Sequence, residues 1–384
     1  MALHPSTLTV IWGCYQGGVE TAIYYRTKQL NRSGGMSHVY FYYPGMGVES
    51  YSEIPHRISS QRSDFLAYLN KHRFDYVTFV NTLYNLDLVA QSVAPAKVLY
   101  EIHGYGSLMA EELERIDRGE DGGLVRGVVA PSPSVAAWAR SFLKNRTDVD
   151  VFVATNTLDL DRFRSTPELE PFLQHTRLRN AWLNSPLLGW VGRLDGNKNW
   201  SLLLDVFRKL RAKRMNFKLL IVSDLTKSRH LHRFYAKAAK YGLVSCVRIL
   251  PNIPHDLMPL YYSLISRSGG VLISTSLSEG YPYNVLEAQA CECPVVCSQI
   301  PGSLELVRHE ETGLTFPLDR PKEAVLAVER LMDDAMLRTR IQHNARTQAL
   351  ERNGMEANVS AYLEWLGKIS EQSAQSLESG TRGG

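Results

Sequence analysis

The sequence predicts an α/β protein built from two doubly wound domains, each with a parallel sheet. Short β-branched, apolar runs alternate along the chain with amphipathic stretches of about 10–15 residues, which is typical of βαβ units. This rhythm occurs twice, on either side of a polar connector that follows Asn156. The length of 384 residues also suits two domains, since one domain usually takes roughly 100–200 residues.

The first series predicts a parallel sheet with helical crossovers, because parallel strands cannot be joined by a tight hairpin. Its predicted strands are 8–12, 38–43, 76–81, 97–102, 127–131 and 149–154. Its predicted helices are 19–32, 61–72, 107–118 and 133–144.

The second series repeats the pattern after a helix predicted within the connector at 168–183. Its predicted strands are 187–191, 217–222, 247–250, 271–275 and 294–297. Its predicted helices are 200–214, 230–241, 256–266, 284–291 and 322–352. Ligands of doubly wound sheets bind at the carboxyl ends of the strands, so we expect a cleft between the two domains.

The domain boundaries follow from the connector and from the end of the second series. We assign 1–165 to an N-terminal domain and 166–350 to a C-terminal domain. A helix over 351–371 is expected to pack back on the N-terminal domain. The Ser- and Gly-rich segment 372–384 is expected to be a disordered tail.

Composition excludes several classes of protein. With 44% hydrophobic and 21% charged residues, the chain has the composition of a globular protein, not of a disordered or fibrous one. A net charge of +4 is too small to indicate nucleic-acid binding. The odd number of five cysteines and the lack of a signal-peptide pattern argue against a disulfide framework and favour the cytoplasm.

Basic residues concentrate in one segment. Residues 205–240 contain eleven Lys and Arg side chains against two Asp. Solvated faces of two helices explain this pattern, and docking to an anionic membrane surface is the alternative. The chain has no apolar run of about 20 residues that would span a membrane. Nothing in the sequence indicates an oligomeric state.

The most informative segment is STSLSEGYPYNVLEAQACECPVVCSQIPG at 274–302. A predicted strand ends there, a polar loop carries Glu279, and Glu287 lies two turns into the next helix. The first turn of that helix offers backbone N–H groups to a diphosphate, and carboxylates accept hydrogen bonds from sugar hydroxyls. From spacing alone, two solvated glutamates are an equally good interpretation.

Two other strand-to-helix loops carry groups suited to a phosphorylated ligand. In LGWVGRLDGNKNW, Arg193 and Lys198 follow a strand and can neutralise a diphosphate. In WGCYQGGVE, Gly17 and Gly18 allow backbone to approach a ligand closely. Neither loop has the GxGxxG pattern, which argues against a nicotinamide dehydrogenase.

Together these segments resemble retaining glycosyltransferases of family 4, which have the GT-B fold. The resemblance runs to about residue 369 and rests on motifs in the order typical of that family. They are GGVE at 17–20, EIHG with His103, VVAPSPSVA at 128–136, NTLDLDRF at 156–163, GRLDGNKN at 192–199, the E-x7-E pair Glu279 and Glu287, PVV and ETGLTF.

The resemblance implies roles for individual residues. Arg193 and Lys198 are expected to bind the donor diphosphate, Glu287 the ribose hydroxyls, and Glu279 the hydroxyls of the donor sugar. The remaining expected donor contacts are Gly280, Tyr281, Tyr283, Asn284 and Val285, together with Gly17 and Gly18 of the first domain. The resemblance further implies that His103 approaches the donor sugar, although a strand-end histidine bonded to backbone is a simpler interpretation.

The reaction implied is the metal-independent transfer of a sugar, with retained configuration, from a nucleotide diphosphate to an acceptor hydroxyl. The resemblance implies that the domain 1–165 binds the acceptor and the domain 166–350 binds the nucleotide sugar. UDP is the expected nucleotide, no cofactor is expected, and the setting is glycan, glycolipid or small-molecule glycoside synthesis. Two alternatives stay open, a nucleotide-sugar epimerase of the same fold and a catalytically inactive partner protein that binds sugar nucleotides.

Two patterns are not interpreted as metal sites. Asp148-x-Asp150 and Asp159-x-Asp161 match a short metal-binding spacing, but both lie near the connector, where Asp is a common turn residue. The cluster Cys291, Cys293 and Cys297 lacks zinc-site spacing. These thiols are expected to be buried and structural.

Overall fold

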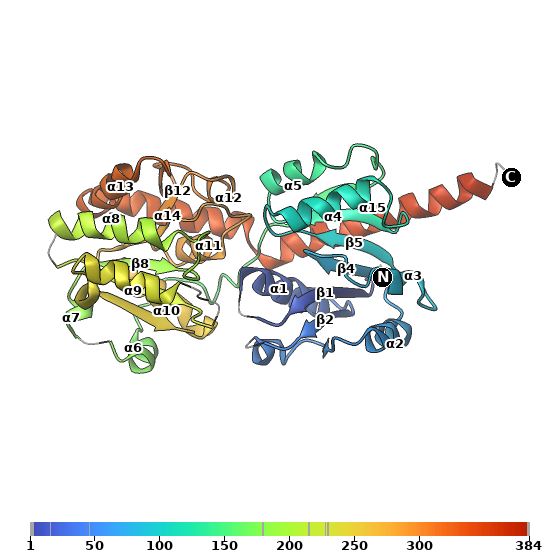
Figure 1. Cartoon of the computed structure of the whole chain (residues 1–384), viewed down its shortest axis with the longest axis horizontal. Coiled ribbons are helices and arrows are strands. Elements are labelled where there is room, and N and C mark those ends of the chain that lie inside the picture. Colours follow the sequence, from blue (N-terminus) through green and yellow to red (C-terminus); the bar gives the residue numbers. More distant parts are fainter. Residues whose placement is uncertain are drawn as a thin grey trace. The chain divides into compact units, whose positions relative to one another are not determined.

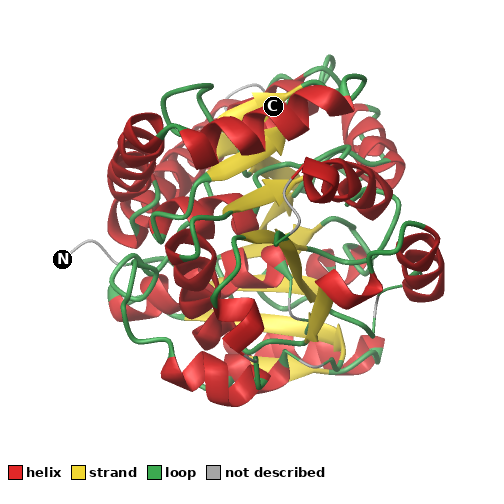
Figure 2. Ribbon diagram, turned by 90° about the vertical axis from the view of Figure 1, so that its left-hand side faces the viewer, coloured by secondary structure: helices red, strands yellow, loops and turns green. Residues whose placement is uncertain are grey.

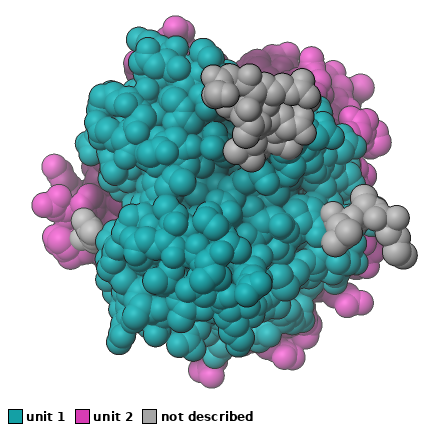
Figure 3. Space-filling model, turned by 90° about the vertical axis from the view of Figure 1, so that its right-hand side faces the viewer, with its two compact units in different colours: residues 1–157, 354–384 teal, residues 158–353 magenta. Residues whose placement is uncertain are grey.

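The computed structural model describes residues 4–15, 17–45, 47–178, 180–213, 216–226, 228 and 230–381. The chain divides into two compact units, unit 1 with residues 1–157 and 354–384 and unit 2 with residues 158–353 (Figure 3). The sequence-based boundaries at 165 and 350 lie close to these divisions.

Unit 1 contains a seven-stranded, all-parallel sheet with the order β3-β2-β1-β4-β5-β6-β7. Its strands are β1 Thr7–Gly13, β2 Ser37–Tyr43, β3 His56–Ile58, β4 Tyr76–Val80, β5 Lys97–Glu101, β6 Val125–Ala130 and β7 Asp150–Val153. Its helices are α1 Gly18–Arg32, η1 Val48–Tyr51, α2 Arg62–His72, α3 Asp87–Ala90, α4 Ser107–Asp117, α5 Pro133–Arg140 and α15 Met355–Thr381 (Figure 1). The direction of the strand order reverses between β1 and β4, which makes this the switch point of the sheet.

Both faces of this sheet are apolar, as a parallel sheet covered by helices requires. Tyr40 and Tyr42 of β2 belong to a core that includes residues of α2, α4 and α5. Val39 and Phe41, which alternate with them, belong to a core on the opposite face with residues of α1. Successive side chains of β2 are therefore buried on opposite faces, which explains the unbroken apolar run of this strand.

Helix α15 packs on the sheet of unit 1, beside α1. Trp365 stacks on Phe152 with ring centroids 4.9 Å apart, and its Nε1 donates a hydrogen bond of 2.7 Å to Asp150. A Cβ at position 127 would lie 2.6 Å from the Trp365 ring. Gly127 in β6 therefore provides the space into which this tryptophan packs.

Unit 2 contains a six-stranded, all-parallel sheet with the order β10-β9-β8-β11-β12-β13. Its strands are β8 Leu187–Val191, β9 Lys218–Ser223, β10 Val247–Pro251, β11 Val271–Ser274, β12 Val295–Ser298 and β13 Leu314–Phe316. Its helices are α6 Glu170–Thr176, α7 Asn180–Leu183, α8 Trp200–Lys213, α9 Leu231–Lys240, η2 Val244–Cys246, η3 His255–Leu257, α10 Met258–Arg267, α11 Tyr283–Ala290, α12 Pro301–Leu304, α13 Pro321–Asp333 and α14 Ala335–Arg352. Figure 2 shows strands flanked by helices, and the two parallel sheets confirm the predicted pair of doubly wound domains. The predicted cleft between them stays a prediction.

Several predicted elements differ from the structure. The helix expected at 322–352 is broken at Asp334, which has an extended backbone and caps α14 by accepting a 2.9 Å hydrogen bond from the Leu337 amide. The helix expected at 168–183 is two short helices, because Arg177 adopts a left-handed conformation that ends α6. The expected disordered tail at 372–384 is also different, since α15 continues to Thr381 and residues 382–384 lie outside the described part. The segment 372–381 contains no proline, so it can extend the packed helix.

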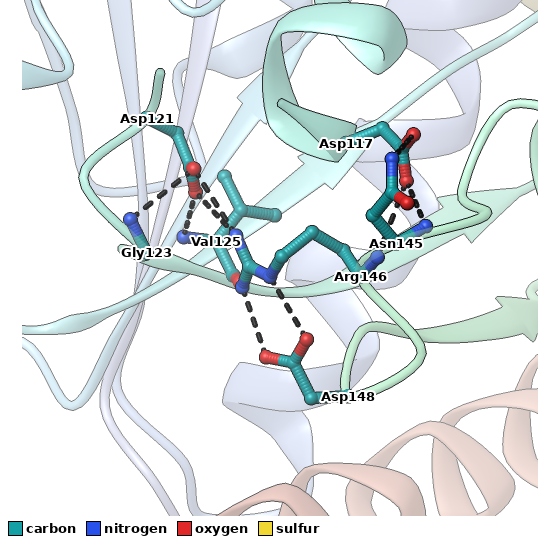
Figure 4. Close-up of polar contacts among 7 residues, drawn as sticks. All are labelled: Asp117, Asp121, Gly123, Val125, Asn145, Arg146 and Asp148. Carbon is teal, nitrogen blue, oxygen red and sulfur yellow. Dashed lines mark hydrogen bonds and ion pairs between the residues drawn. The ribbon is translucent and has the colours of Figure 1, made fainter. Parts of the chain in front are cut away.

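Both aspartates of the Asp148-x-Asp150 pattern make structural contacts, Asp148 with Arg146 (Figure 4) and Asp150 with Trp365. Arg146 donates hydrogen bonds of 2.8 and 3.0 Å to Asp148 and a hydrogen bond of 3.1 Å to Asp121. Asp121 in turn accepts a 2.8 Å hydrogen bond from the Val125 amide at the start of β6. Within the described ranges, no group of three or more His, Cys, Asp or Glu side chains is arranged to hold a metal ion.

The structure also shows the state of the cysteines and whether any described helix could span a membrane. All five cysteines are buried and free, which confirms the buried thiols predicted for Cys291, Cys293 and Cys297. Burial raises the pKa of Cys293 and of Cys297 to about 12. In the part of the chain that the structure describes, no helix combines the length and the apolar character needed to cross a bilayer.

Candidate functional site

The candidate site of unit 2 lies at the switch point of its sheet. The strand order reverses between the neighbouring strands β8 and β11, and ligands of doubly wound folds bind at the carboxyl edge of this point. The loop after β8 carries Arg193 and Lys198, and the loop after β11 carries Glu279. All three predicted residues therefore follow the two strands at which a ligand is expected.

Lys198 and Glu279 form an ion pair, with 2.5 Å between Nζ and Oε1. The side chains retain 19% and 14% of their exposure, so the pair is shielded from bulk water without being sealed from a ligand. The attraction between opposite charges is stronger at such a site than in bulk water. The sequence predicted both residues but not their contact.

Hydrogen bonds between backbone and side chains hold the two loops together. The Leu277 amide donates to the Asn197 carbonyl at 2.8 Å, and the Asn197 side chain donates to the Ser278 carbonyl at 3.0 Å. Thr275 donates to the Lys198 carbonyl at 2.9 Å. The Lys198–Glu279 pair is thus placed by a rigid frame, which reduces the conformational cost of binding a ligand.

Asp195 organises the cations of the first loop and was missed in the sequence. Its carboxylate accepts a 2.9 Å hydrogen bond from Arg193 Nε and another of 2.9 Å from the Lys198 amide. The Arg193 side chain is half exposed, and a guanidinium group carries further N–H donors besides Nε. The Arg-x-Asp spacing in GRLDGNKN was the signal that could have identified Asp195.

Glu287 is buried in α11, with a protein partner for each carboxylate oxygen. Oε1 lies 2.8 Å from His255 Nε2, and Oε2 accepts a 2.7 Å hydrogen bond from Tyr262. Burial, followed by the nearby Glu287 charge, raises the pKa of Tyr262 well above its ordinary value. His255 and Tyr262 were missed because no motif connects them to Glu287 in the sequence.

The start of α11 is tied to β8. Asn284 donates a 3.1 Å hydrogen bond to the Val191 carbonyl at the end of that strand. The Val285 amide donates to the Pro282 carbonyl at 3.2 Å and to Asn284 Oδ1 at 3.0 Å. The expected phosphate contact through Val285 therefore competes with these internal bonds. Tyr281 and Tyr283 are buried beside this turn.

The backbone of Gly302, at the start of α12, lies against the loop that carries Glu279. A Cβ on Gly302 would lie 2.1 Å from the Glu279 carbonyl oxygen and 2.9 Å from the Gly280 carbonyl carbon. Only glycine fits at this distance, so Gly302 positions the loop. The Pro-Gly pair after PVVCSQI was the sequence signal, but its partner could not be inferred.

Replacing Gly302 with alanine is expected to lower the rate of the reaction that this site supports by about 10²-fold, because the added Cβ must displace the loop of Glu279 and small misplacements of catalytic groups have effects of this order. Steady-state kinetics and a thermal melt would measure the effect. Gly367→Ala, in a helix where the added Cβ meets no atom within 4 Å, is the matched control. A Gly302→Ala protein with unchanged kcat would contradict this positioning role.

The predicted residues of unit 1 lie at the carboxyl edge of its sheet. Gly17 precedes α1 with an extended backbone, and α1 begins at Gly18. His103 follows β5, where its amide donates a 3.1 Å hydrogen bond to Asn81 Oδ1. The approach of these three residues to a donor stays a prediction.

His103 belongs to a buried ionic cluster. Its Nε2 lies 2.8 Å from Glu101 Oε1, and the other oxygen of Glu101 pairs with Arg26 of α1. Burial opposes ionisation of Glu101, but Arg26 and the His103 hydrogen bond outweigh it and lower the pKa of this carboxyl to about 2. A cavity of about 20 Å³ beside the cluster, lined in part by Asn156 and Tyr362, has room for one water molecule.

Many cations of the basic segment 205–240 have partners within unit 2. Lys237 pairs with Asp205 at 2.9 Å, and Lys213 pairs with Glu329 at 2.8 Å. Arg208 lies over the Tyr241 ring, 4.6 Å from its centroid. Arg214, Lys227 and Arg229 lie outside the described residues. These contacts favour the interpretation that the basic residues belong to helix faces within the fold over the interpretation that they form a membrane-docking surface.

The fold and the unit-2 site define a two-domain α/β protein of the GT-B type. The family described as "Glycosyl transferases group 1" matches residues 177–348. The chain therefore carries a glycosyltransferase group 1 domain, which occupies most of unit 2.

Two curated relatives support this assignment. Over 271 residues the chain is 31% identical to the D-inositol 3-phosphate glycosyltransferase of Acidothermus cellulolyticus, covering 66% of this chain and 59% of the relative. Over 195 residues it is 29% identical to glycosyltransferase 1 domain-containing protein 1 of Xenopus tropicalis, covering 51% of this chain and 54% of the relative. The chain thus spans a little more than half the length of these relatives.

Solved structures share the fold of the whole chain. The crystal structure of Anabaena Alr3699/HepE in complex with UDP-glucose aligns with a TM-score of 0.80 and 18% identity, covering 95% of this chain and all of that one. Sucrose-phosphate synthase from Thermosynechococcus elongatus aligns with a TM-score of 0.75 and 17% identity, covering 97% of this chain and all of that one.

Proposed function

We propose that the protein is a retaining glycosyltransferase that moves a sugar from a UDP-sugar to an acceptor hydroxyl. The observation that carries the proposal is the Lys198–Glu279 pair, which joins the loops after β8 and β11 at the switch point of unit 2. In this proposal the cation of the pair binds the diphosphate and the neighbouring carboxylate binds the donor sugar. The UDP-glucose bound in the crystal structure of HepE supports UDP as the nucleotide of the proposed donor.

The proposed reaction depends on electrostatics and positioning. Lys198 and Arg193 stabilise the negative charge that develops on the leaving diphosphate, and Glu279 orients the donor sugar through its hydroxyls. The acceptor hydroxyl attacks the anomeric carbon from the face that the diphosphate leaves. The departing phosphate takes the acceptor proton, so the anomeric configuration is retained without a covalent intermediate.

Glu287 has a binding role in this proposal. Its carboxylate accepts hydrogen bonds from the ribose hydroxyls of the nucleotide. His255 and Tyr262 hold this carboxylate in place through the contacts of 2.8 and 2.7 Å. Carboxylate oxygens have several lone pairs and can accept these additional bonds. Neither a metal nor a cofactor takes part in the proposed reaction.

A donor panel tests the proposal. The protein is incubated with UDP-, GDP- and ADP-hexoses, with and without acceptor sugars and with and without EDTA, and nucleoside diphosphate release is measured. We expect acceptor-dependent, EDTA-resistant UDP release and a product whose anomeric proton shows retained configuration by NMR. An epimerised donor formed without acceptor would instead identify an epimerase. Tight UDP binding without turnover would identify an inactive binding protein.

A further inference from the structure

Three half-exposed aromatic rings gather at the carboxyl edge of the unit-1 sheet. We call Trp12, Tyr43 and Tyr84 the aromatic platform. Their exposed fractions are 44%, 43% and 44%. Large apolar side chains that stay in water contribute little to folding, and a group of them on one surface is typical of a binding site.

Trp12 packs against both of the other rings of the platform. Trp12 lies 5.1 Å from Tyr43 and 5.7 Å from Tyr84 between ring centroids. Below them, Tyr42 lies 5.9 Å from Trp12 and 5.2 Å from Tyr84. The three side chains therefore form one continuous surface supported by a buried fourth ring.

The platform lies at the switch point of the unit-1 sheet. Trp12 is near the end of β1, Tyr43 ends β2, and Tyr84 lies in the loop after β4. The strand order reverses between β1 and β4, and this is where doubly wound sheets bind ligands. His103 follows the next strand, β5, on the same edge.

Close backbone packing holds the platform in shape. A Cβ on Gly45 would lie 2.2 Å from the Cys14 carbonyl oxygen, so the loop after Tyr43 rests directly on the loop after Trp12. Tyr42 donates a 2.9 Å hydrogen bond to the Tyr84 carbonyl. Rings fixed in this way lose little conformational freedom when a ligand stacks on them.

The charges described beside the platform are compensated. Arg62, the cation that lies near Tyr42 and Tyr84, pairs with Asp87 and donates a hydrogen bond of 2.5 Å to Asn85. An anionic ligand or an anionic membrane would be favoured by unpaired cations. The platform instead suits a neutral ligand with an apolar face and hydroxyls at its rim.

We infer that the aromatic platform binds a neutral pyranose ring, which serves as the sugar acceptor. Only the role of the bound sugar as acceptor rests on the proposed function. The axial C–H bonds of a pyranose are weakly positive and pack against the negative face of an aromatic ring. The ring hydroxyls stay at the edge of the stack, where Tyr43 and Tyr84 can meet them with their phenol groups.

Saturation-transfer-difference NMR tests the inference without any donor. The probes are maltose and cellobiose as neutral pyranosides, with glucose 6-phosphate as an anionic comparison. We expect signals from the sugar ring C–H protons and an affinity that falls by about tenfold or more in Trp12→Ala, as for other rings stacked on aromatic side chains. Trp12→Phe keeps a ring face and is expected to retain part of the affinity. Tyr84→Ala is a second variant, in a loop, in case Trp12→Ala does not fold.

The matched control is Tyr235→Ala, which removes an aromatic side chain of α9 with 42% exposure. It should leave sugar binding unchanged. The inference is overturned if neither disaccharide binds at millimolar concentration, if both bind equally to Trp12→Ala and Tyr84→Ala, or if glucose 6-phosphate is preferred. It is also overturned if Trp12 is needed for binding to phosphatidylglycerol vesicles or for self-association, and sugars do not bind.

These outcomes separate the two proposals. Sugar binding that depends on Trp12, without any transfer from the donor panel, keeps the platform and contradicts the proposed function. Acceptor-dependent transfer with an unchanged acceptor KM in Trp12→Ala and Tyr84→Ala keeps the function and overturns the acceptor role of the platform. If both proposals hold, Trp12→Ala raises the acceptor KM about tenfold and leaves the donor KM unchanged.

Discussion

Replacing Lys198 with methionine is expected to lower kcat for sugar transfer by about 10²–10³-fold, the usual effect of removing one group that stabilises developing negative charge. Lys198 pairs with Glu279 at 2.5 Å and lies in a loop that is hydrogen-bonded to the loop after β11. Methionine keeps most of the side-chain volume and removes only the cation. Steady-state kinetics with saturating donor, together with the Kd for UDP, would measure the change.

The control is Lys240→Met, which removes an exposed cation at the end of α9 and should leave kcat unchanged. A Glu279→Gln variant and the double variant show whether the two groups act as a unit. If they do, the double variant loses less than the product of the two single losses. An unchanged kcat in Lys198→Met would remove this lysine from the proposed mechanism.

Replacing Glu101 with alanine is expected to destabilise unit 1 by about 3–5 kcal/mol, because it removes the carboxylate that compensates the buried Arg26 charge. The Arg26 and Glu101 side chains retain only 11% and 2% of their exposure. The midpoint of urea unfolding, followed for unit 1, would measure the loss. Removing both charges with Arg26→Leu and Glu101→Leu should recover most of it, since no buried charge is then left alone.

The same pair predicts a pH dependence. Glu101 has a pKa of about 2 in the folded protein, against the ordinary value of 4.5 for a glutamate. The folded state therefore binds fewer protons than the unfolded state between these values. The ionised Glu101 carboxylate contributes about 3 kcal/mol to the free energy of unfolding. This contribution is complete above the pKa of the unfolded state and is lost as the pH falls toward the pKa of the folded state. Glu101→Ala should show a weaker dependence over this range, whereas Glu53→Ala, at an exposed pair with Lys28, should behave like the unchanged protein.

The longer elements could be predicted from the sequence, but the short ones could not. Strands such as 76–81 and helices such as α8 extend over enough residues to show a period. Strands β3 and β13 have three residues each, which is too short for any period to appear. The break between α13 and α14 depends on the capping contact of Asp334, which the continuous pattern over 322–352 concealed.

The candidate site shows the same division. Lys198, Glu279 and Glu287 were predicted because each lies beside a recognisable strand-to-helix loop. The sequence did not predict His255, Tyr262 and Gly302. The role of each depends on its contact with a residue distant in the sequence, either Glu287 or the loop of Glu279.

The sequence by itself determined the two βα series and the chemical groups on their loops, because periodicity and motifs depend on near neighbours in the chain. Only the tertiary structure decided that Lys198 meets Glu279, 81 residues away, and that Trp12, Tyr43 and Tyr84 form one surface. Such contacts depend on the strand order, which brings the ends of β8 and β11, or of β1 and β4, to one edge. Strand order follows from the packing of whole faces, which no local pattern records.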